Sequence, residues 1–198
     1  MITFINNNID IPYKIFREKY NQAYLQKQDS IQSIAISSFS PKSNEVYSRY
    51  VNLKIVDDKN FIFFTNYDSP KSKQFEMHNQ ISATIFWSKT NTQIRMLAKI
   101  QKMSKSFNNE YFINRNLKKN ALAISSNQSN QIDSYSQVIE NYNRSLESDD
   151  LKKCPDYWGG FSFIPYYFEF WDGHESRINK REVYGLAGGI WKHSFLQP

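Results

Sequence analysis

The strongest constraint on the fold is an alternation of apolar and polar side chains at every second residue, which recurs in short segments. Residues 50–55, for example, read YVNLKI, and similar segments lie between residues 31 and 103 and between 161 and 195. Successive residues of a strand face opposite sides of a sheet, so this period predicts strands with one buried face. We therefore expect a mainly β fold with helices, in which about six or seven antiparallel strands form a sheet that closes most easily as a barrel.

Other segments carry helix signals. Asp10 and Pro12 can begin a helix with aromatic residues at helical spacing, and Ser69 and Pro70 can begin a short helix that ends near residue 78. Two more helices are expected near 104–115 and 133–146, with the polar stretch 121–131 leading to the second. We interpret residues 1–29 as a helical lead-in and residues 30–198 as a single domain.

Charge and composition limit the partners. The 198 residues have a net charge of +6 and a pI near 9.2, but the basic residues are spread along the chain without a cluster. This distribution argues against nucleic acid and remains compatible with a small phosphorylated ligand. The aromatic content of 16% is typical of a β-rich core and also suits a protein that holds planar ligands.

The cysteine and histidine residues narrow the possibilities further. Cys154 is the single cysteine, so no intramolecular disulfide can form and a reducing cytoplasm is the expected location. No segment approaches the roughly 20 apolar residues of a membrane helix, and residues 1–14 do not read as a secretory signal, so we expect neither a membrane partner nor processing. The three histidines have no metal-ligand spacing, so no metal is expected.

A tyrosine, an arginine and a lysine in the middle of the chain follow one another at intervals of four residues. Tyr111, Arg115 and Lys119 would lie on one face of a continuous helix and could grip a phosphate. Charge runs of this kind are more often a solvated helix face, and spacing alone favours that interpretation.

Three earlier cations could also bind an anion. Arg49 and Lys54 are five residues apart, so a regular strand would place them on opposite faces unless a bulge brings them together. Lys71 lies in the first turn of the predicted short helix, where free backbone N–H groups favour an anion.

The stretch FEFWDGHESRINKR, residues 168–181, places an aromatic run before a turn and basic residues after it. If residues 177–184 form a strand, then Arg177, Asn179 and Arg181 share one face. This face could be a charged sheet edge that discourages aggregation, or an anion site beside the flat ring of Trp171.

In their order along the chain, several segments resemble the pyridoxine/pyridoxamine 5'-phosphate oxidase family, the FMN-dependent split-barrel enzymes of vitamin B6 metabolism. The matching elements span roughly residues 30 to 198 and comprise YSRYVNLK, FFTNYDSPKSKQ, the strand that begins at Gln93, YFINR, NQS, YWGGF, FEFWDGHESR with the arginine at position 181, and the proline at position 198.

The resemblance implies an FMN-binding split β-barrel that works as a homodimer, with FMN at the interface between the two chains. It implies oxidation of pyridoxamine or pyridoxine 5'-phosphate to pyridoxal 5'-phosphate, with O2 as the electron acceptor. The implied FMN-binding residues are Arg49, Lys54, Phe64, Thr65, Lys71, Gln93, Gln128, Ser129, Trp171 and Arg181. The implied substrate-binding residues are Lys54, Tyr111, Arg115, Lys119, Arg177 and Asn179, of which Arg177 and Asn179 are the catalytic candidates.

Three positions depart from the family pattern. Lys119 stands where the family has a serine at the substrate phosphate, Asn179 where it has a histidine over the substrate ring, and Pro70 where it has an arginine beside the FMN phosphate. These departures leave two alternatives open: a split-barrel oxidase of another substrate, such as those of phenazine biosynthesis, and a protein that binds FMN or pyridoxal phosphate without turnover.

Overall fold

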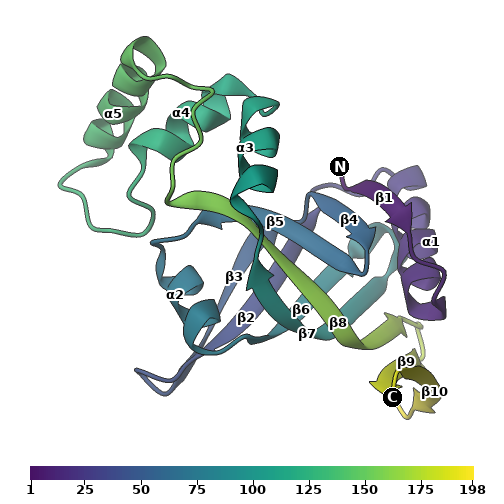
Figure 1. Cartoon of the computed structure of the whole chain (residues 1–198). Helices are drawn as coiled ribbons and strands as arrows, with labels where there is room; N and C mark the ends of the chain where they lie inside the picture. The colour runs from purple at the N-terminus through teal and green to yellow at the C-terminus, as the bar shows by residue number, and fades with distance from the viewer.

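A single ten-stranded sheet with helices around it makes up the structure, a computed structural model that describes residues 1–198 (Figure 1). The strand order is β1-β4-β5-β8-β7-β6-β2-β3, and β9 pairs with β8 and β10 with β9. The strands are β1 (Thr3–Asn7), β2 (Ser33–Ser40), β3 (Glu45–Asn52), β4 (Ile55–Asp58), β5 (Asn60–Asn66), β6 (Gln80–Trp87), β7 (Thr92–Lys102), β8 (Trp158–Asp172), β9 (Lys180–Ala187) and β10 (Ile190–Leu196). The helices are α1 (Ile11–Leu25), α2 (Pro70–Met77), α3 (Lys105–Ile113), α4 (Leu117–Ser125) and α5 (Tyr135–Ser148), with one 3-10 turn at Ser88–Thr90.

The mainly β prediction is confirmed, but the sheet has more strands than expected. The segment at 49–55 divides into β3 and β4, and β1 lacks an alternation of buried and exposed residues. β1 also pairs with β4 in parallel, with Thr3 opposite Ile55, whereas an all-antiparallel sheet was predicted. Its role is to cover the edge of β4, which would otherwise be free to pair with another chain.

The helix predictions need one correction. Residues 121–131 were expected to be a polar connection, but residues 117–125 form α4. The side chain of Asn116 caps this helix by accepting a hydrogen bond from the backbone N–H of Lys119 at 3.4 Å. α3 ends at Ile113, so the two helices are separate and the chain between them changes direction.

The core is one cluster of 27 buried residues, in which phenylalanine side chains of β5 and β8 stack across the sheet, as Phe61 does on Phe163 with ring centroids 5.2 Å apart. Tyr13, Phe16 and Tyr20 of α1 belong to this same cluster, so the lead-in helix covers part of the sheet. The division between residues 1–29 and 30–198 stays a prediction.

Figure 1 shows how β8 connects two distant parts of the molecule. α3, α4 and α5 gather near its beginning, whereas the β9–β10 hairpin projects from its far end, close to the C-terminus. None of the helices has the length and apolar character needed to cross a membrane.

Candidate functional site

Nine of the predicted site residues surround one cavity. The cavity has a volume of about 410 Å³ and lies between β3, β5, α2 and α3. Its lining includes the predicted residues Arg49, Lys54, Phe64, Thr65, Lys71, Tyr111, Arg115, Gln128 and Ser129. Arg49 and Lys54 meet there because β3 ends at Asn52 and the chain bends before β4, so the strand rule that separated them does not apply.

The cavity is lined by four cations and no carboxylate. Burial lowers the pKa of Lys71 to about 8, with a further contribution from the charge of Arg49. Burial also lowers the pKa of Lys54, assisted by the charges of Lys119 and Arg115. Cations that have lost water without gaining a counter-ion are stabilised by an anionic ligand, so the site is built to take one.

The guanidinium of Arg49 is held in place by the neighbouring strand β2 and by α2. It donates to Ser38 Oγ at 2.7 Å, to the carbonyl oxygen of Ile36 at 3.3 Å and to Gln74 Oε1 at 2.7 Å. Ser38 and Gln74 are 2% and 6% exposed, so this anchor is buried. Sequence reasoning missed both residues, since a serine and a glutamine carry no spacing signal of their own.

Lys71 is oriented by the loop that follows α4. Its ammonium group donates to Gln128 Oε1 at 2.7 Å and to Ser69 Oγ at 3.0 Å, and Thr65 Oγ1 donates to the same Gln128 oxygen at 2.9 Å. The next residue, Ser129, has a φ of +71°, a left-handed conformation that turns the loop around the cavity. Lysine, amide and hydroxyl groups of this kind are suited to a phosphate.

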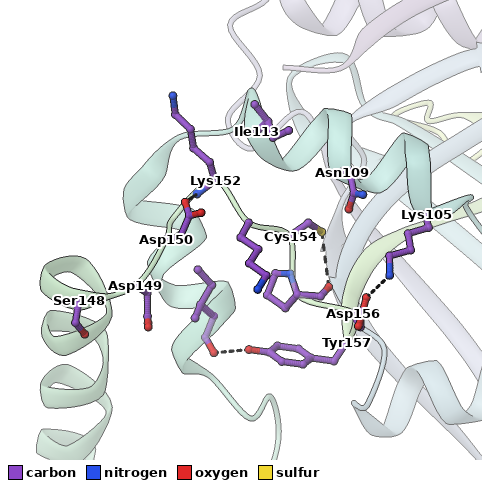
Figure 2. Close-up of a pocket in the computed structure, with 13 residues that line it drawn as sticks. Lys105, Asn109, Ile113, Ser148, Asp149, Asp150, Lys152, Cys154, Asp156 and Tyr157 are labelled. Carbon is purple, nitrogen blue, oxygen red and sulfur yellow. Dashed lines mark hydrogen bonds and ion pairs between the residues drawn. The ribbon is translucent and has the colours of Figure 1, made fainter.

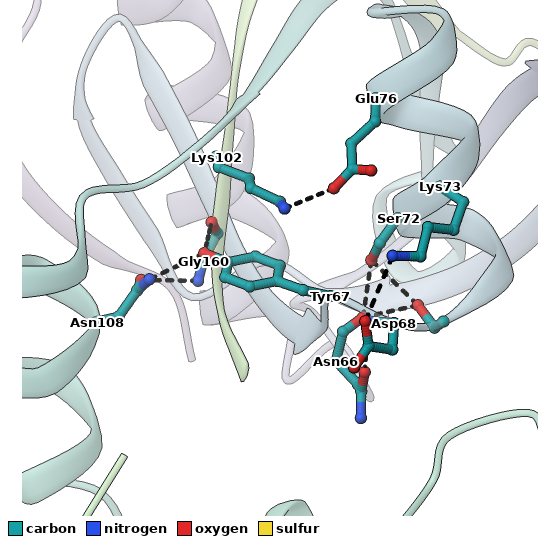
Figure 3. Close-up of polar contacts among 10 residues, drawn as sticks. Asn66, Tyr67, Asp68, Ser72, Lys73, Glu76, Lys102, Asn108 and Gly160 are labelled. Carbon is teal, nitrogen blue, oxygen red and sulfur yellow. Dashed lines mark hydrogen bonds and ion pairs between the residues drawn. The ribbon is translucent and has the colours of Figure 1, made fainter. Parts of the chain in front are cut away.

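A buried hydrogen-bond network links α3 to β8 and to the residue that follows β5 (Figure 3). Tyr67 donates to the carbonyl oxygen of Gly160 at 2.9 Å, and Asn108 donates to the Tyr67 hydroxyl at 2.9 Å. The backbone N–H of Gly160 donates to Asn108 Oδ1 at 2.9 Å, which closes the triangle. The network therefore fixes the position of α3, and with it Tyr111, which lies one turn further along this helix.

Aromatic rings form one wall. Phe64 stacks on Tyr111 with ring centroids 3.7 Å apart and an angle of 14° between the planes, and on Trp158 at 5.1 Å and 9°. The guanidinium carbon of Arg115 lies 5.0 Å from the centroid of the Trp158 ring. These contacts place a cation and a phenol beside flat apolar surface.

The prediction that Tyr111, Arg115 and Lys119 share one helix face was wrong in its geometry. Tyr111 is on α3, Arg115 is in the break between helices, and Lys119 is on α4. Lys119 lines an adjoining cavity of about 190 Å³ that shares Phe64, Thr65, Arg115 and Gln128 with the first. The break in the helix still brings the three residues toward one place.

The remaining predicted residues form a second group at the other end of the sheet. Gln93 of β7 is directly opposite Trp171 of β8, which is directly opposite Arg181 of β9. Directly paired residues of adjacent strands project from the same face, so the three form a row.

The predicted strand face with Arg177, Asn179 and Arg181 is not formed. β9 begins only at Lys180, and Arg177 has a φ of +59° within a turn. Asn179 Oδ1 accepts a hydrogen bond from the backbone N–H of His174 at 3.0 Å, so its side chain folds back to hold that turn. Gly173 packs so close to Asn91 that a Cβ at this position would overlap its side chain.

The two groups of residues are far apart along one chain. Gly160 pairs with Phe64 at the first group, and Trp171 lies in the second, both on β8. At about 3.3 Å per residue, their separation of eleven residues corresponds to roughly 36 Å of strand. One chain therefore presents two halves of the predicted site.

A larger cavity, of about 770 Å³, lies on the opposite side of α3 and contains none of the predicted residues (Figure 2). Its cations have acidic neighbours: Lys105 pairs with Asp156 at 2.7 Å, and Asp149 and Asp150 also line it. Burial raises the pKa of the Cys154 thiol there to about 11. This balanced, open cavity lacks the uncompensated charge of the first.

Comparison with known proteins gives consistent results. The pyridoxine/pyridoxamine 5'-phosphate oxidase of Pseudomonas putida is 30% identical over 191 residues, which cover 94% of this chain and 88% of that protein. The enzyme of the same name from Vesicomyosocius okutanii is 31% identical over 189 residues, with the same coverage. The chain belongs to the pyridoxine/pyridoxamine 5'-phosphate oxidase family.

The family model described as the pyridoxine 5'-phosphate oxidase C-terminal dimerisation region matches residues 158–198. Among solved structures, PhzG from Burkholderia lata, in complex with tetrahydrophenazine-1-carboxylic acid, superposes with a TM-score of 0.88 at 21% identity over 94% of this chain and 92% of that one. A pyridoxamine 5'-phosphate oxidase-related, FMN-binding protein from Nostoc punctiforme superposes with a TM-score of 0.77 at 12% identity, covering 92% and 97%. These likenesses confirm the split-barrel fold.

Membership of this family identifies the chain as an FMN-dependent oxidoreductase. The donor set agrees with the cofactor, since the cations, hydroxyl groups and amides around the first cavity are the groups that bind a phosphate, and Phe64 and Trp158 offer flat surface.

Proposed function

We propose that the protein oxidises pyridoxamine or pyridoxine 5'-phosphate to pyridoxal 5'-phosphate, with O2 as the final electron acceptor. The observation that carries this proposal is the cavity with Arg49, Lys54, Lys71 and Arg115 around it and no carboxylate, in a chain that belongs to this family. A single phosphate would leave part of that charge unbalanced, whereas two phosphorylated ligands side by side would balance it.

The cations divide between the two ligands. We assign the FMN phosphate to Arg49, Lys71, Gln128 and Ser129. These residues meet where the beginning of α2 faces the loop after α4. We assign the substrate phosphate to Lys54, Tyr111, Arg115 and Lys119. Burial is the largest cause of the lowered pKa of Lys54, and the charges of Lys119 and Arg115 lower it further, so both cations lie near Lys54.

The chemistry follows the same division. When bound, FMN would supply the redox chemistry, as a hydride acceptor that O2 reoxidises to give hydrogen peroxide; with pyridoxamine phosphate, water would then release ammonia from the oxidised substrate. The chain would bind the two phosphates and orient the substrate ring beside the aromatic wall of Phe64, Tyr111 and Trp158. Arg177 and Asn179, in the β8–β9 turn, are the residues we assign to the substrate ring.

A complete site requires two copies of the chain. The row of Gln93, Trp171 and Arg181 lies about 36 Å along β8 from the phosphate cavity, and residues 158–198 match a dimerisation region. We infer a homodimer in which the row of one protomer completes the cavity of its partner, which gives two equivalent sites.

Asn179 and Lys119 favour a second candidate, the oxidation of a different substrate by the same site. Asn179 carries no titratable group, and its carbonyl oxygen is engaged by the backbone N–H of His174. Lys119 adds a positive charge where the family has a hydroxyl group. Both changes affect the substrate residues and leave the FMN residues in place.

Turnover separates these possibilities. The purified protein should be yellow and should release about one FMN per chain on denaturation. It should then produce hydrogen peroxide in equal amount to pyridoxal phosphate when given either B6 phosphate. Bound FMN without turnover of either phosphate would exclude the first substrate class and favour the second candidate, and failure to bind FMN would refute both.

A further inference from the structure

A buried carboxylate lies next to the row of Gln93, Trp171 and Arg181. Glu169 of β8 is 3% exposed and is directly opposite Arg95 of β7. Its Oε1 atom accepts a hydrogen bond from Nε of Arg181 at 2.9 Å and lies 2.8 Å from Nη2 of the same side chain in an ion pair. Its Oε2 atom accepts from Arg95 and from the hydroxyl of Tyr167, the latter at 3.2 Å. One carboxylate thus holds arginines from the strands on both sides of it.

The carboxylate remains ionised in this setting. Burial alone would raise the pKa of Glu169, but the hydrogen bond from Arg181 and the charges of Arg95 and Arg181 outweigh burial and lower it. With two guanidinium groups and one carboxylate, the cluster has a net charge of +1. Glu169 therefore neutralises one of the two guanidinium charges and links the two arginines.

The contacts also fix the orientation of Arg181. A guanidinium group has five N–H donors. Nε of Arg181 donates to Glu169, Nη1 donates to the carbonyl oxygen of Gln197 at 2.9 Å, and Nη2 is held in the ion pair with Glu169. N–H groups on Nη1 and Nη2 therefore remain for a ligand. The side chain is 27% exposed, so this free edge can reach a ligand beside Trp171.

We propose that Glu169 is a positioning residue for the cofactor, which holds the guanidinium of Arg181 so that its remaining N–H groups on Nη1 and Nη2 face the flavin. The proposal rests on the proposed FMN site, in which Arg181 contacts the cofactor. The side-chain amide of a glutamine at position 169 could not replace the carboxylate, because its NH2 group would face one of the two guanidinium groups. Arg181 would then be free to rotate about its side-chain torsions.

A double-mutant cycle on the dimeric protein tests the proposal. FMN dissociation constants are measured by flavin fluorescence for the wild type, Glu169→Gln, Arg181→Gln and the double variant. Each single change should weaken FMN binding about tenfold, the loss expected for a charged hydrogen bond. The FMN dissociation constant of the double variant should be no higher than the larger of the two single-variant values, because both changes remove the same contact.

Arg95→Gln is the matched control, since Arg95 shares the carboxylate but lies on the other side of it, away from Arg181. Its FMN affinity should stay within about twofold of the wild type. Thermal unfolding of the FMN-free proteins shows separately how much stability each change removes. A purely structural role of Glu169 would lower the melting temperature of Glu169→Gln and Arg95→Gln alike without the non-additive loss of FMN.

The proposal is overturned if Arg181→Gln weakens FMN binding and Glu169→Gln does not, or if the two effects add. It is also overturned if Arg181→Gln has no effect on a protein that binds FMN, because Arg181 is then no ligand. A wild-type protein that takes up no FMN refutes the proposed function itself. If Glu169→Gln does not fold, the cycle is run with Glu169→Asp, which keeps the charge but withdraws it from Arg181 and should show the same non-additivity.

Discussion

If the site is shared between two protomers, two chains that are each defective in FMN binding should regain it when they pair with each other. One chain carries Arg49→Ala and Lys71→Ala, which remove the phosphate-binding cations of the cavity. The other carries Gln93→Ala and Trp171→Ala, which remove two members of the row at the far end of β8. At about 1–3 kcal/mol for each lost contact, either pair of changes should weaken FMN binding at least about 30-fold.

The expected recovery follows from the arrangement of the halves. When the two chains are unfolded together in equal amounts and refolded, random pairing makes half of the dimers mixed. In a mixed dimer one site receives both damaged halves and the other receives two intact halves. About one site in four is then complete, so bound FMN should reach roughly 0.25 per chain at a concentration where the parent proteins bind little.

Equilibrium dialysis measures the bound FMN, and native mass spectrometry measures the fraction of mixed dimers. FMN retention is the chosen assay because it does not depend on which substrate the enzyme prefers. Mixed dimers that retain no more FMN than the parents would mean that the cavity and the row of the same chain act together. A site shared between the two protomers would then be excluded.

Four further outcomes follow from the site. Because FMN phosphate favours the charged form of Lys71, whose pKa is lowered to about 8, FMN affinity should fall as pH rises above about 8, and Lys71→Arg should remove this dependence in a dialysis titration. The folded pKa lies below that of an unfolded lysine, near 10.4, so the unfolding free energy of the FMN-free protein should rise with pH between these values and should not do so in Lys71→Arg. Lys119→Ser should raise KM for a phosphorylated substrate about fivefold, through loss of about 1 kcal/mol, with little effect on kcat; an effect on kcat alone would contradict the assignment. Asn179→His should raise kcat more than it changes KM, and Asn179→Ala, which loses the same turn hydrogen bond without gaining an imidazole, should lower kcat; equal kcat values for the two variants would exclude a role for the imidazole.

Much of the fold could be predicted from local patterns. The alternation in residues 81–87 and 93–103 matches β6 and β7 because these strands bury one face, and Gly188-Gly189 is the turn between β9 and β10. β1 was missed because its five residues, TFINN, are too polar and too short to show a period. α4 was missed because its polar residues resemble a loop and its cap, Asn116, is also a residue typical of turns.

The site was harder to predict, since its residues come together through register and chain direction. Spacing would separate Arg49 from Lys54, and only the end of β3 at Asn52 explains why both line one cavity. Spacing also gave Arg177 and Arg181 a common strand face, which the left-handed backbone of Arg177 prevents. The buried partner of Arg181, Glu169, twelve residues away on the neighbouring strand, had no local signal at all.

The triangle of Tyr67, Asn108 and Gly160 has an evolutionary consequence through its neighbour Gly159. A Cβ at position 159 would overlap both the Tyr67 hydroxyl and the Asn108 amide, so none of these residues can change alone without breaking the others' contacts. In diverging relatives we expect them to be replaced together or not at all. Lys119 lies on α4 and Asn179 lies in an exposed turn, so each can be substituted independently of the other. Members of the family could thus evolve to use a different substrate while they keep FMN as the cofactor.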